Sequence, residues 1–249
     1  MRRRPALANF SSMMLAAGAV LAPAASAATG GSGFGPAPVS APASGGETVQ
    51  LANTTVQASG NGITVTTQAT TLLRHRLTFA GQANARTGYI VEIERRGPQT
   101  HNAWVPTAYG PVSSGGSFTA VWPTNHPGRF SIRAVLQSPR AATSRATPTA
   151  PALTITVYRP AVATTYGPGF WGSQTACGQV LRHATLGVAN RTLPCGTQVS
   201  LLWHGHTIIV PVIDRGPYAN GADWDLTMAT AHALGIPGTE TIGAVGLTR

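Results

Sequence analysis

The 249-residue sequence has no lysine, two cysteines and only seven acidic residues. All 17 basic side chains are therefore arginines, and the formal net charge is +10. Aromatic residues make up 6% of the chain and are not interleaved with a basic segment, so the composition gives no support to nucleic-acid binding. No apolar run approaches the roughly 20 residues that a transmembrane helix needs. These shortages argue against a nucleic-acid-binding protein and against an integral membrane protein.

The first 27 residues predict a secretory signal peptide. Three arginines at positions 2–4 precede an apolar run over 13–21, and Ala25, Ser26 and Ala27 form a small-residue cleavage site. We therefore expect a secreted or cell-wall protein whose mature chain begins after Ala27. Residues 28–46 consist mostly of Gly, Ser, Ala and Pro without apolar periodicity, which predicts a disordered linker.

The positive charge is concentrated in the first half of the chain. Residues 47–160 contain ten arginines and three glutamates, a net charge of 10 − 3 = +7, whereas the four arginines after residue 160 are balanced by four acids. Such an excess can attract an anionic wall polymer. Scattered arginines can equally form an ordinary solvated surface, and the sequence leaves both interpretations open.

Residues 47–159 predict an immunoglobulin-like β-sandwich. Short alternating segments separated by Gly, Pro and Asn are typical of this fold. Residues 128–135 resemble the closing strands of bacterial immunoglobulin-like repeats. Three histidines, His75, His101 and His126, lack metal-ligand spacing, so we predict no site in this domain. The segments expected to form strands are residues 48–53, 63–67, 76–80, 89–94, 117–122, 130–135 and 153–158.

A cluster of acids marks the second half of the chain. Asp214, Asp223 and Asp225 lie within twelve residues, and Glu240 is the only other acid after residue 160. The β-branched, apolar run at 207–213 predicts a buried strand that ends at Asp214, because Arg-Gly-Pro follows it. A carboxylate at such a strand end can be tuned for catalysis, or it can simply accept hydrogen bonds from the turn amides.

Four ordered motifs in the last 85 residues resemble one family. They are Tyr-Gly-Pro-Gly at 166–169, Thr-Ala-Cys-Gly at 175–178, Arg-Thr-Leu-Pro-Cys-Gly-Thr at 191–197, and Asp-Arg-Gly-Pro at 214–217 with Trp-Asp-Leu-Thr at 224–227. The segment is similar to the rare-lipoprotein-A-like double-psi β-barrels of septal-ring lytic transglycosylases and bacterial expansins. The resemblance implies a mainly β protein with a six-stranded double-psi β-barrel over 160–249. A hairpin at 204–206 and a helix over 226–234 agree with it.

The resemblance also implies a sugar-binding groove and a reaction. Asp214 and Asp225 match the family's groove-facing acids, so we predict that they are catalytic. The implied function is lytic transglycosylation of peptidoglycan glycan strands, forming 1,6-anhydro-muramic ends; one carboxyl group can serve as both acid and base. We expect a monomer that needs no cofactor or metal. The residues predicted to bind substrate are Tyr166, Gln179, Asn190, Arg215, Tyr218 and Trp224.

Three departures from the family pattern support an alternative function. Gln179, Arg182 and Asn190 stand where lytic relatives commonly have Glu, Asp and His. Gln and Asn can hydrogen-bond a sugar hydroxyl but cannot transfer a proton as a carboxyl or imidazole group does. The alternative is therefore a non-catalytic, expansin-like module that binds glycan or loosens the wall.

The two cysteines predict a disulfide. Cys177 and Cys195 form an even pair in a chain expected to be exported, where oxidation is the rule. The alternatives have less support, because neither cysteine has a nucleophile context and the pair with His183 lacks the spacing of a zinc site.

Overall fold

The computed structural model describes residues 54–139, 149–218 and 221–247. The predicted signal peptide, the linker and the strand expected at 48–53 lie outside these residues. The described part is mainly β, with one short α-helix and one 3-10 turn. None of its helices is long and apolar enough to cross a membrane.

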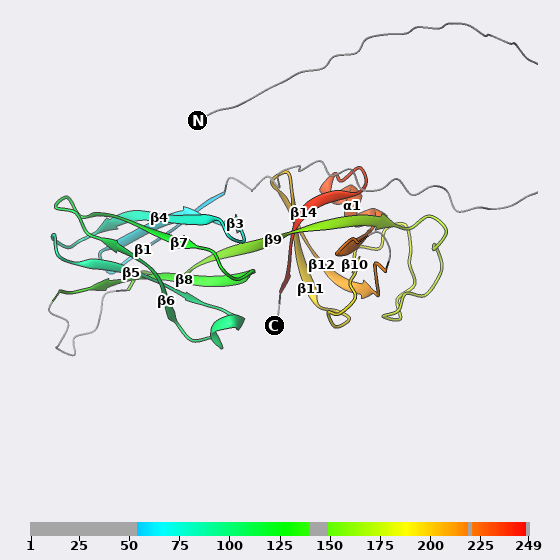
Figure 1. Ribbon diagram of the computed structural model, residues 1–249, viewed down its shortest axis with the longest axis horizontal. Helices are drawn as coiled ribbons and strands as arrows, with labels where there is room; N and C mark the ends of the chain where they lie inside the picture. The colour runs from blue at the N-terminus through cyan, green and yellow to red at the C-terminus, as the bar shows by residue number, and fades with distance from the viewer. Residues whose placement is uncertain (1–53, 140–148, 219–220, 248–249) are drawn as a thin grey trace, which may run out of the picture. The chain divides into compact units, whose positions relative to one another are not determined.

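Two sheets form the first region (Figure 1). The first is antiparallel, with the strand order β1-β2-β4-β7. The second has the order β9-β8-β5-β6, and β3 pairs in parallel with β9. The bounds are β1 Thr55–Gly60, β2 Ile63–Gln68, β3 Thr70–Leu72, β4 Arg76–Ala83, β5 Ile90–Arg96, η1 Pro98–Thr100, β6 Val105–Pro111, β7 Ser117–Pro123, β8 Gly128–Gln137 and β9 Leu153–Tyr166.

A single hydrophobic core lies between the two sheets. Alternate residues of each strand point inward, as the period of two in a β-strand requires. Phe79 of β4 and Trp122 of β7 come from the first sheet, and Phe130 and Ile155 come from the second. The predicted strands from residue 63 onward are confirmed. The short strands β1 and β3 and the proline-containing β6 were not predicted.

Strand β9 connects this region to the next one. Its first half pairs with β8, and its second half pairs with β13 and β14. At the junction, the hydroxyl groups of Tyr158 and Ser200 lie 2.9 Å apart. Tyr158 packs with Leu72, Leu202 and Val245 in a small buried cluster. The two regions therefore share a continuous strand and apolar contacts.

The second region is a closed barrel of six strands among the described residues. The ring runs β9-β13-β10-β12-β11-β14 and returns to β9. The pairs β9–β13 and β10–β12 are parallel, and the other four are antiparallel. This closure agrees with the six strands expected from the sequence. The bounds are β10 Val188–Ala189, β11 Gln198–Trp203, β12 His206–Asp214, β13 Trp224–Thr227 and β14 Glu240–Leu247.

The α-helix α1 spans Met228–Leu234, two residues less than the predicted helix at its start. Leu226 belongs to β13, because it pairs with Thr165 of β9. Thr227 caps the helix by accepting a hydrogen bond from the Thr230 N–H group. Gly235 ends the helix with a φ of 80°, a left-handed conformation that favours glycine.

Candidate active site

The barrel brings Asp214 and Asp225 together through the short strand β10. Asp214 is the last residue of β12 and pairs with Ala189 of β10. Asp225 of β13 pairs with the same alanine from the other side. Two strand spacings separate the backbones of the two aspartates by roughly 10 Å. The charge of Asp214 raises the pKa of the Asp225 carboxyl group, so the two carboxyl groups are close enough to interact.

Asp225 has the properties of a proton donor. Its side chain is partly buried, and burial raises the pKa of its carboxyl group above the usual range. The nearby charge of Asp214 also raises this pKa. The Thr164 hydroxyl donates a hydrogen bond of 2.9 Å to Oδ1 of Asp225, which opposes the rise because it stabilises the charged form. The carboxyl group therefore keeps its proton to a higher pH than an exposed aspartate.

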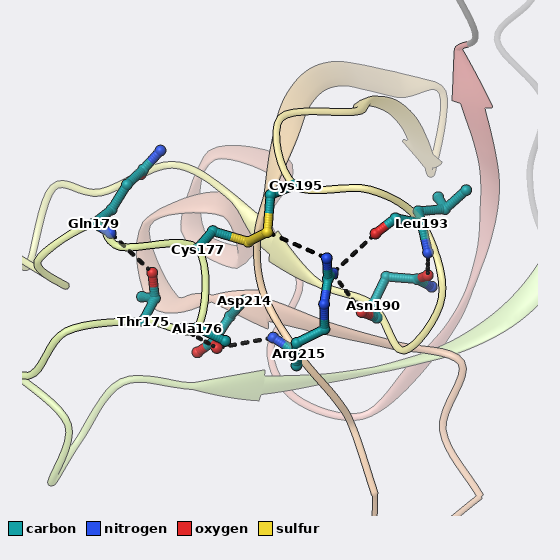
Figure 2. The surroundings of a disulfide bond; sticks show 9 residues. All are labelled: Thr175, Ala176, Cys177, Gln179, Asn190, Leu193, Cys195, Asp214 and Arg215. Carbon is teal, nitrogen blue, oxygen red and sulfur yellow. Dashed lines mark hydrogen bonds between the residues drawn. A yellow bond between two sulfur atoms is a disulfide. The ribbon is translucent and has the colours of Figure 1, made fainter.

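Backbone amides hold Asp214. Its Oδ1 accepts hydrogen bonds from the N–H groups of Ala176, at 2.9 Å, and Arg215, at 2.8 Å (Figure 2). The sequence left open whether Asp214 is tuned for catalysis or binds turn amides, and the structure shows the amide contacts. These two donors fix the orientation of the Asp214 carboxylate.

The predicted disulfide is confirmed. Cys177 and Cys195 are bonded, with their Cα atoms 5.7 Å apart. The bond joins the loop that carries Ala176 to the turn before β11 (Figure 2). Next to it, the Arg215 guanidinium group donates to the carbonyl oxygen of Leu193, at 2.9 Å, and to Sγ of Cys195, at 3.2 Å. The disulfide therefore cross-links the two loops next to Asp214.

Tyr166 lies on the same face of β9 as Thr164, two residues away. Its hydroxyl group is buried, and no group in the described part of the chain is within hydrogen-bonding distance of it. Burial raises the pKa of the phenol, and the charges of Asp214 and Asp225 raise it further. The hydroxyl is therefore a protonated donor with no protein acceptor among the described residues, near both carboxyl groups.

Other predicted site residues have different surroundings. The Asn190 side-chain oxygen accepts hydrogen bonds from the N–H groups of Thr192 and Leu193, so it holds a turn. The Gln179 side chain is exposed and points away from Asp214 (Figure 2).

The two remaining aromatic candidates differ in exposure. Trp224 is only 8% exposed and packs in the barrel core. Tyr218 is 79% exposed and follows the cis Gly216–Pro217 peptide bond. Tyr166 is thus a predicted substrate-binding residue whose phenol feels the charges of both acids.

Two groups of the site were not predicted from the sequence. One is the Thr164 hydroxyl, which binds Asp225. Thr164 lies two residues before Tyr166, and residues two apart in a strand point to the same face. This spacing is the sequence feature from which Thr164 could have been predicted. The other is the backbone N–H group of Ala176, whose role does not depend on the identity of its side chain and so leaves no signal in the sequence. No cluster of three or more His, Cys, Asp or Glu residues suited to a metal ion occurs among the described residues.

Comparison with known proteins supports the geometry. Residues 161–246 match the family model described as lytic transglycolase, whose label denotes a double-psi β-barrel. The barrel region belongs to the RlpA-like double-psi β-barrel family. The match begins at residue 161. It therefore includes the second half of β9 but none of the preceding strands of the two-sheet region.

Several curated relatives carry the name RlpA. The probable endolytic peptidoglycan transglycosylase RlpA of Synechocystis is 41% identical over 87 residues, which are 34% of this chain and 27% of the relative. The protein of the same name from Aquifex aeolicus is 42% identical over 76 residues, 30% of this chain and 34% of the relative. The endolytic peptidoglycan transglycosylase RlpA of Campylobacter jejuni is 36% identical over 75 residues, 29% of this chain and 27% of the relative. The matches thus span about a quarter to a third of these relatives.

Proposed function

We propose that this protein is a lytic transglycosylase acting on peptidoglycan glycan strands, with Asp225 as the acid and base. One observation carries the proposal. Asp225 is partly buried and has a raised pKa, and the charge of Asp214 acts on it, in a domain of the RlpA-like family. The relatives' names supply the substrate and the type of reaction.

The proposed reaction needs one proton-transferring group. Protonated Asp225 donates its proton to the glycosidic oxygen as the bond from that oxygen to C1 of the muramic residue breaks. The C6 hydroxyl of the same residue attacks C1 and passes its proton to the Asp225 carboxylate, which restores the acid. No water is consumed, and the product is a 1,6-anhydro-muramic end. Because Thr164 binds Oδ1 of Asp225, Oδ2 is the oxygen available to carry the proton.

The neighbouring groups have supporting roles in this proposal. The fixed negative charge of Asp214 stabilises the positive charge that develops at C1 in an oxocarbenium-like transition state. Tyr166 also remains a predicted substrate-binding residue through its ring beside the two carboxyl groups, because its hydroxyl group is buried. Gln179, Asn190, Arg215, Tyr218 and Trp224 remain predicted substrate-binding residues.

A non-catalytic glycan-binding module is the second candidate. The observation that favours it is the identity of Asn190 and Gln179, whose side chains do not titrate, at two positions where lytic relatives commonly have a titratable residue. In this case the same groove would hold glycan through Asp214, Asp225 and Tyr166 without cleavage.

Product analysis separates the two candidates. The protein is incubated with purified glycan strands, and mass spectrometry distinguishes 1,6-anhydro ends from hydrolysed reducing ends. We expect anhydro ends from the wild type and none from a folded Asp225→Asn variant. Retention of glycan without any new ends would support the binding module instead, and hydrolysed ends would contradict the internal attack by the C6 hydroxyl.

We further propose an exported, wall-associated location and an immunoglobulin-like class for the first region. The location follows from the predicted signal peptide and from the peptidoglycan substrate in the relatives' names. The immunoglobulin-like assignment is supported by the two facing sheets and by the parallel pairing of β3 with β9.

A further inference from the structure

The outer face of the second sheet carries a row of polar side chains across three strands. Arg96 of β5 pairs with Ser131 of β8, and Ser131 pairs with Thr154 of β9. Arg129 lies two residues before Ser131 and projects to the same face. In such a sheet, diagonal neighbours such as Arg96 and Arg129 have their Cβ atoms about 7–8 Å apart. Two guanidinium groups and two hydroxyl groups therefore share one patch.

This patch is the floor of a cavity of about 580 Å³. Gln99 and Asn102, from η1 and the loop after it, add amide groups to its wall. The Arg96 guanidinium carbon lies 4.9 Å from the centre of the Trp104 ring, and stacking limits the freedom of that side chain. The cavity therefore offers several hydrogen-bond donors, one of them held in place by an aromatic ring.

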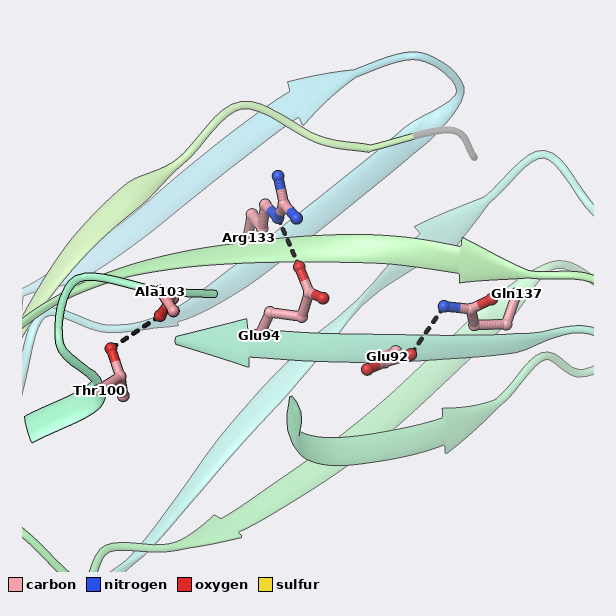
Figure 3. A network of polar contacts seen from close by, with 6 residues as sticks. All are labelled: Glu92, Glu94, Thr100, Ala103, Arg133 and Gln137. Carbon is pink, nitrogen blue, oxygen red and sulfur yellow. Dashed lines mark hydrogen bonds and ion pairs between the residues drawn. The ribbon is translucent and has the colours of Figure 1, made fainter. Parts of the chain in front are cut away.

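No acidic residue lines the cavity. The two acids in the described part of this region, Glu92 and Glu94, lie on the same sheet and already have side-chain partners (Figure 3). Glu94 forms an ion pair with Arg133, and Glu92 accepts a hydrogen bond of 2.7 Å from Gln137. The charges of Arg96 and Arg129 are thus not neutralised by a carboxylate lining the cavity, and a negatively charged ligand can neutralise them.

A second cavity, of about 640 Å³, adjoins the first. The two share Pro98, Gln99 and Gly246 in their walls. The second cavity is also lined by Arg159 and Arg191, and by Asp223 and Trp224 of the barrel. The two adjoining cavities therefore extend from Arg96 and Arg129 to the barrel beside β13, the strand that also carries Asp225 on its other face.

We propose that the cavity at Arg96 and Arg129 binds carboxylate groups of the glycan strand on which the barrel acts. This inference rests on the proposed function for the identity of the polymer. Muramic residues carry a carboxyl group, which is free in strands without peptides and is replaced by the carboxylates of the stem peptide in substituted strands. Both sources present the same chemistry to a planar guanidinium group.

Binding is measured with the full chain carrying Asp225→Asn, so that the glycan stays intact. The test variant adds Arg96→Gln and Arg129→Gln. The matched control adds Arg76→Gln and Arg86→Gln, which remove the same charge from exposed positions that line neither cavity. The probes are glycan strands without peptides, strands with stem peptides, and a neutral N-acetylglucosamine oligomer of similar length.

We expect the Arg96 and Arg129 changes to weaken binding of a carboxylate-bearing strand about tenfold and to leave the neutral oligomer unaffected. The control should change binding less than twofold. A loss confined to peptide-free strands identifies the muramyl carboxylate, and a loss confined to substituted strands identifies the stem peptide. Equal losses in the test and control variants, or no loss in either, would overturn the proposal. Failure of the wild type to form anhydro ends, with arginine-dependent binding intact, would instead overturn only the proposed reaction.

Discussion

The disulfide should make a large contribution to the stability of the barrel. It closes a loop of 18 residues, for which the chain-entropy relation gives about 3 kcal/mol at 25 °C. Replacing Cys177 and Cys195 together by alanine is therefore expected to lower the free energy of unfolding by about 3 kcal/mol. The change should also reduce cleavage, because the Ala176 N–H group that orients Asp214 lies next to Cys177.

Urea unfolding with linear extrapolation measures this change. The control is reductant, which should destabilise the wild type by the same amount and leave the double variant unaffected. A loss below about 1 kcal/mol would show that the bond does not constrain the unfolded chain as the entropic argument requires. Unchanged cleavage by the double variant would show that the Ala176 contact with Asp214 does not depend on the disulfide.

Four further substitutions of single side chains give testable predictions. Thr164→Val removes a hydrogen bond that stabilises charged Asp225, so the alkaline limb of the pH–rate profile should move to higher pH. Asp214→Asn removes a charge that raises the pKa of Asp225, so this variant should move the alkaline limb to lower pH. Shifts of the opposite sign would contradict the assignment of Asp225 as the acid. Tyr166→Phe should raise the free energy of unfolding by up to about 1 kcal/mol, because it removes a buried hydroxyl group that has no partner among the described residues; a loss of stability would contradict this reasoning. Nε and Nη1 of Arg95 are buried without a partner among the described residues, so Arg95→Met should raise the free energy of unfolding by about 1 kcal/mol in urea titrations. A loss of stability would mean that the stacking of Arg95 on Trp122 and Phe130 stabilises the fold by more than the two unpaired groups cost.

Local patterns predicted the elements that have a clear period or a clear turn. The β11–β12 hairpin was predicted because Gly205 lies between two apolar runs, and its φ of 81° explains the glycine. Strand β10 was not predicted, because two residues carry no measurable period. Ala189 becomes part of the site only through pairing with two strands that lie distant in the sequence.

The chemistry of the site was only partly accessible from the sequence. Motif spacing identified both aspartates, but the raised pKa that favours Asp225 as the acid depends on burial and on the nearby charge of Asp214, which the fold supplies. The early exclusion of any site in the first region rested on its histidines. The proposed carboxylate site there comes from arginines and hydroxyl groups on neighbouring strands, whose register the sequence does not reveal.

The rate of anhydro-end formation by Asp225→Asn tests the central claim most directly. An amide keeps the shape of the carboxyl group but cannot exchange the proton, so the rate should fall by a factor of about 10²–10⁴. Asp223→Asn is the matched control, because the Asp223 carboxylate accepts a hydrogen bond of 3.1 Å from the Val162 N–H group and so has a structural partner. The rate of anhydro-end formation by this variant should stay within about tenfold of the wild-type rate. A folded Asp225→Asn protein that forms anhydro ends at a rate within tenfold of the wild type would contradict the account.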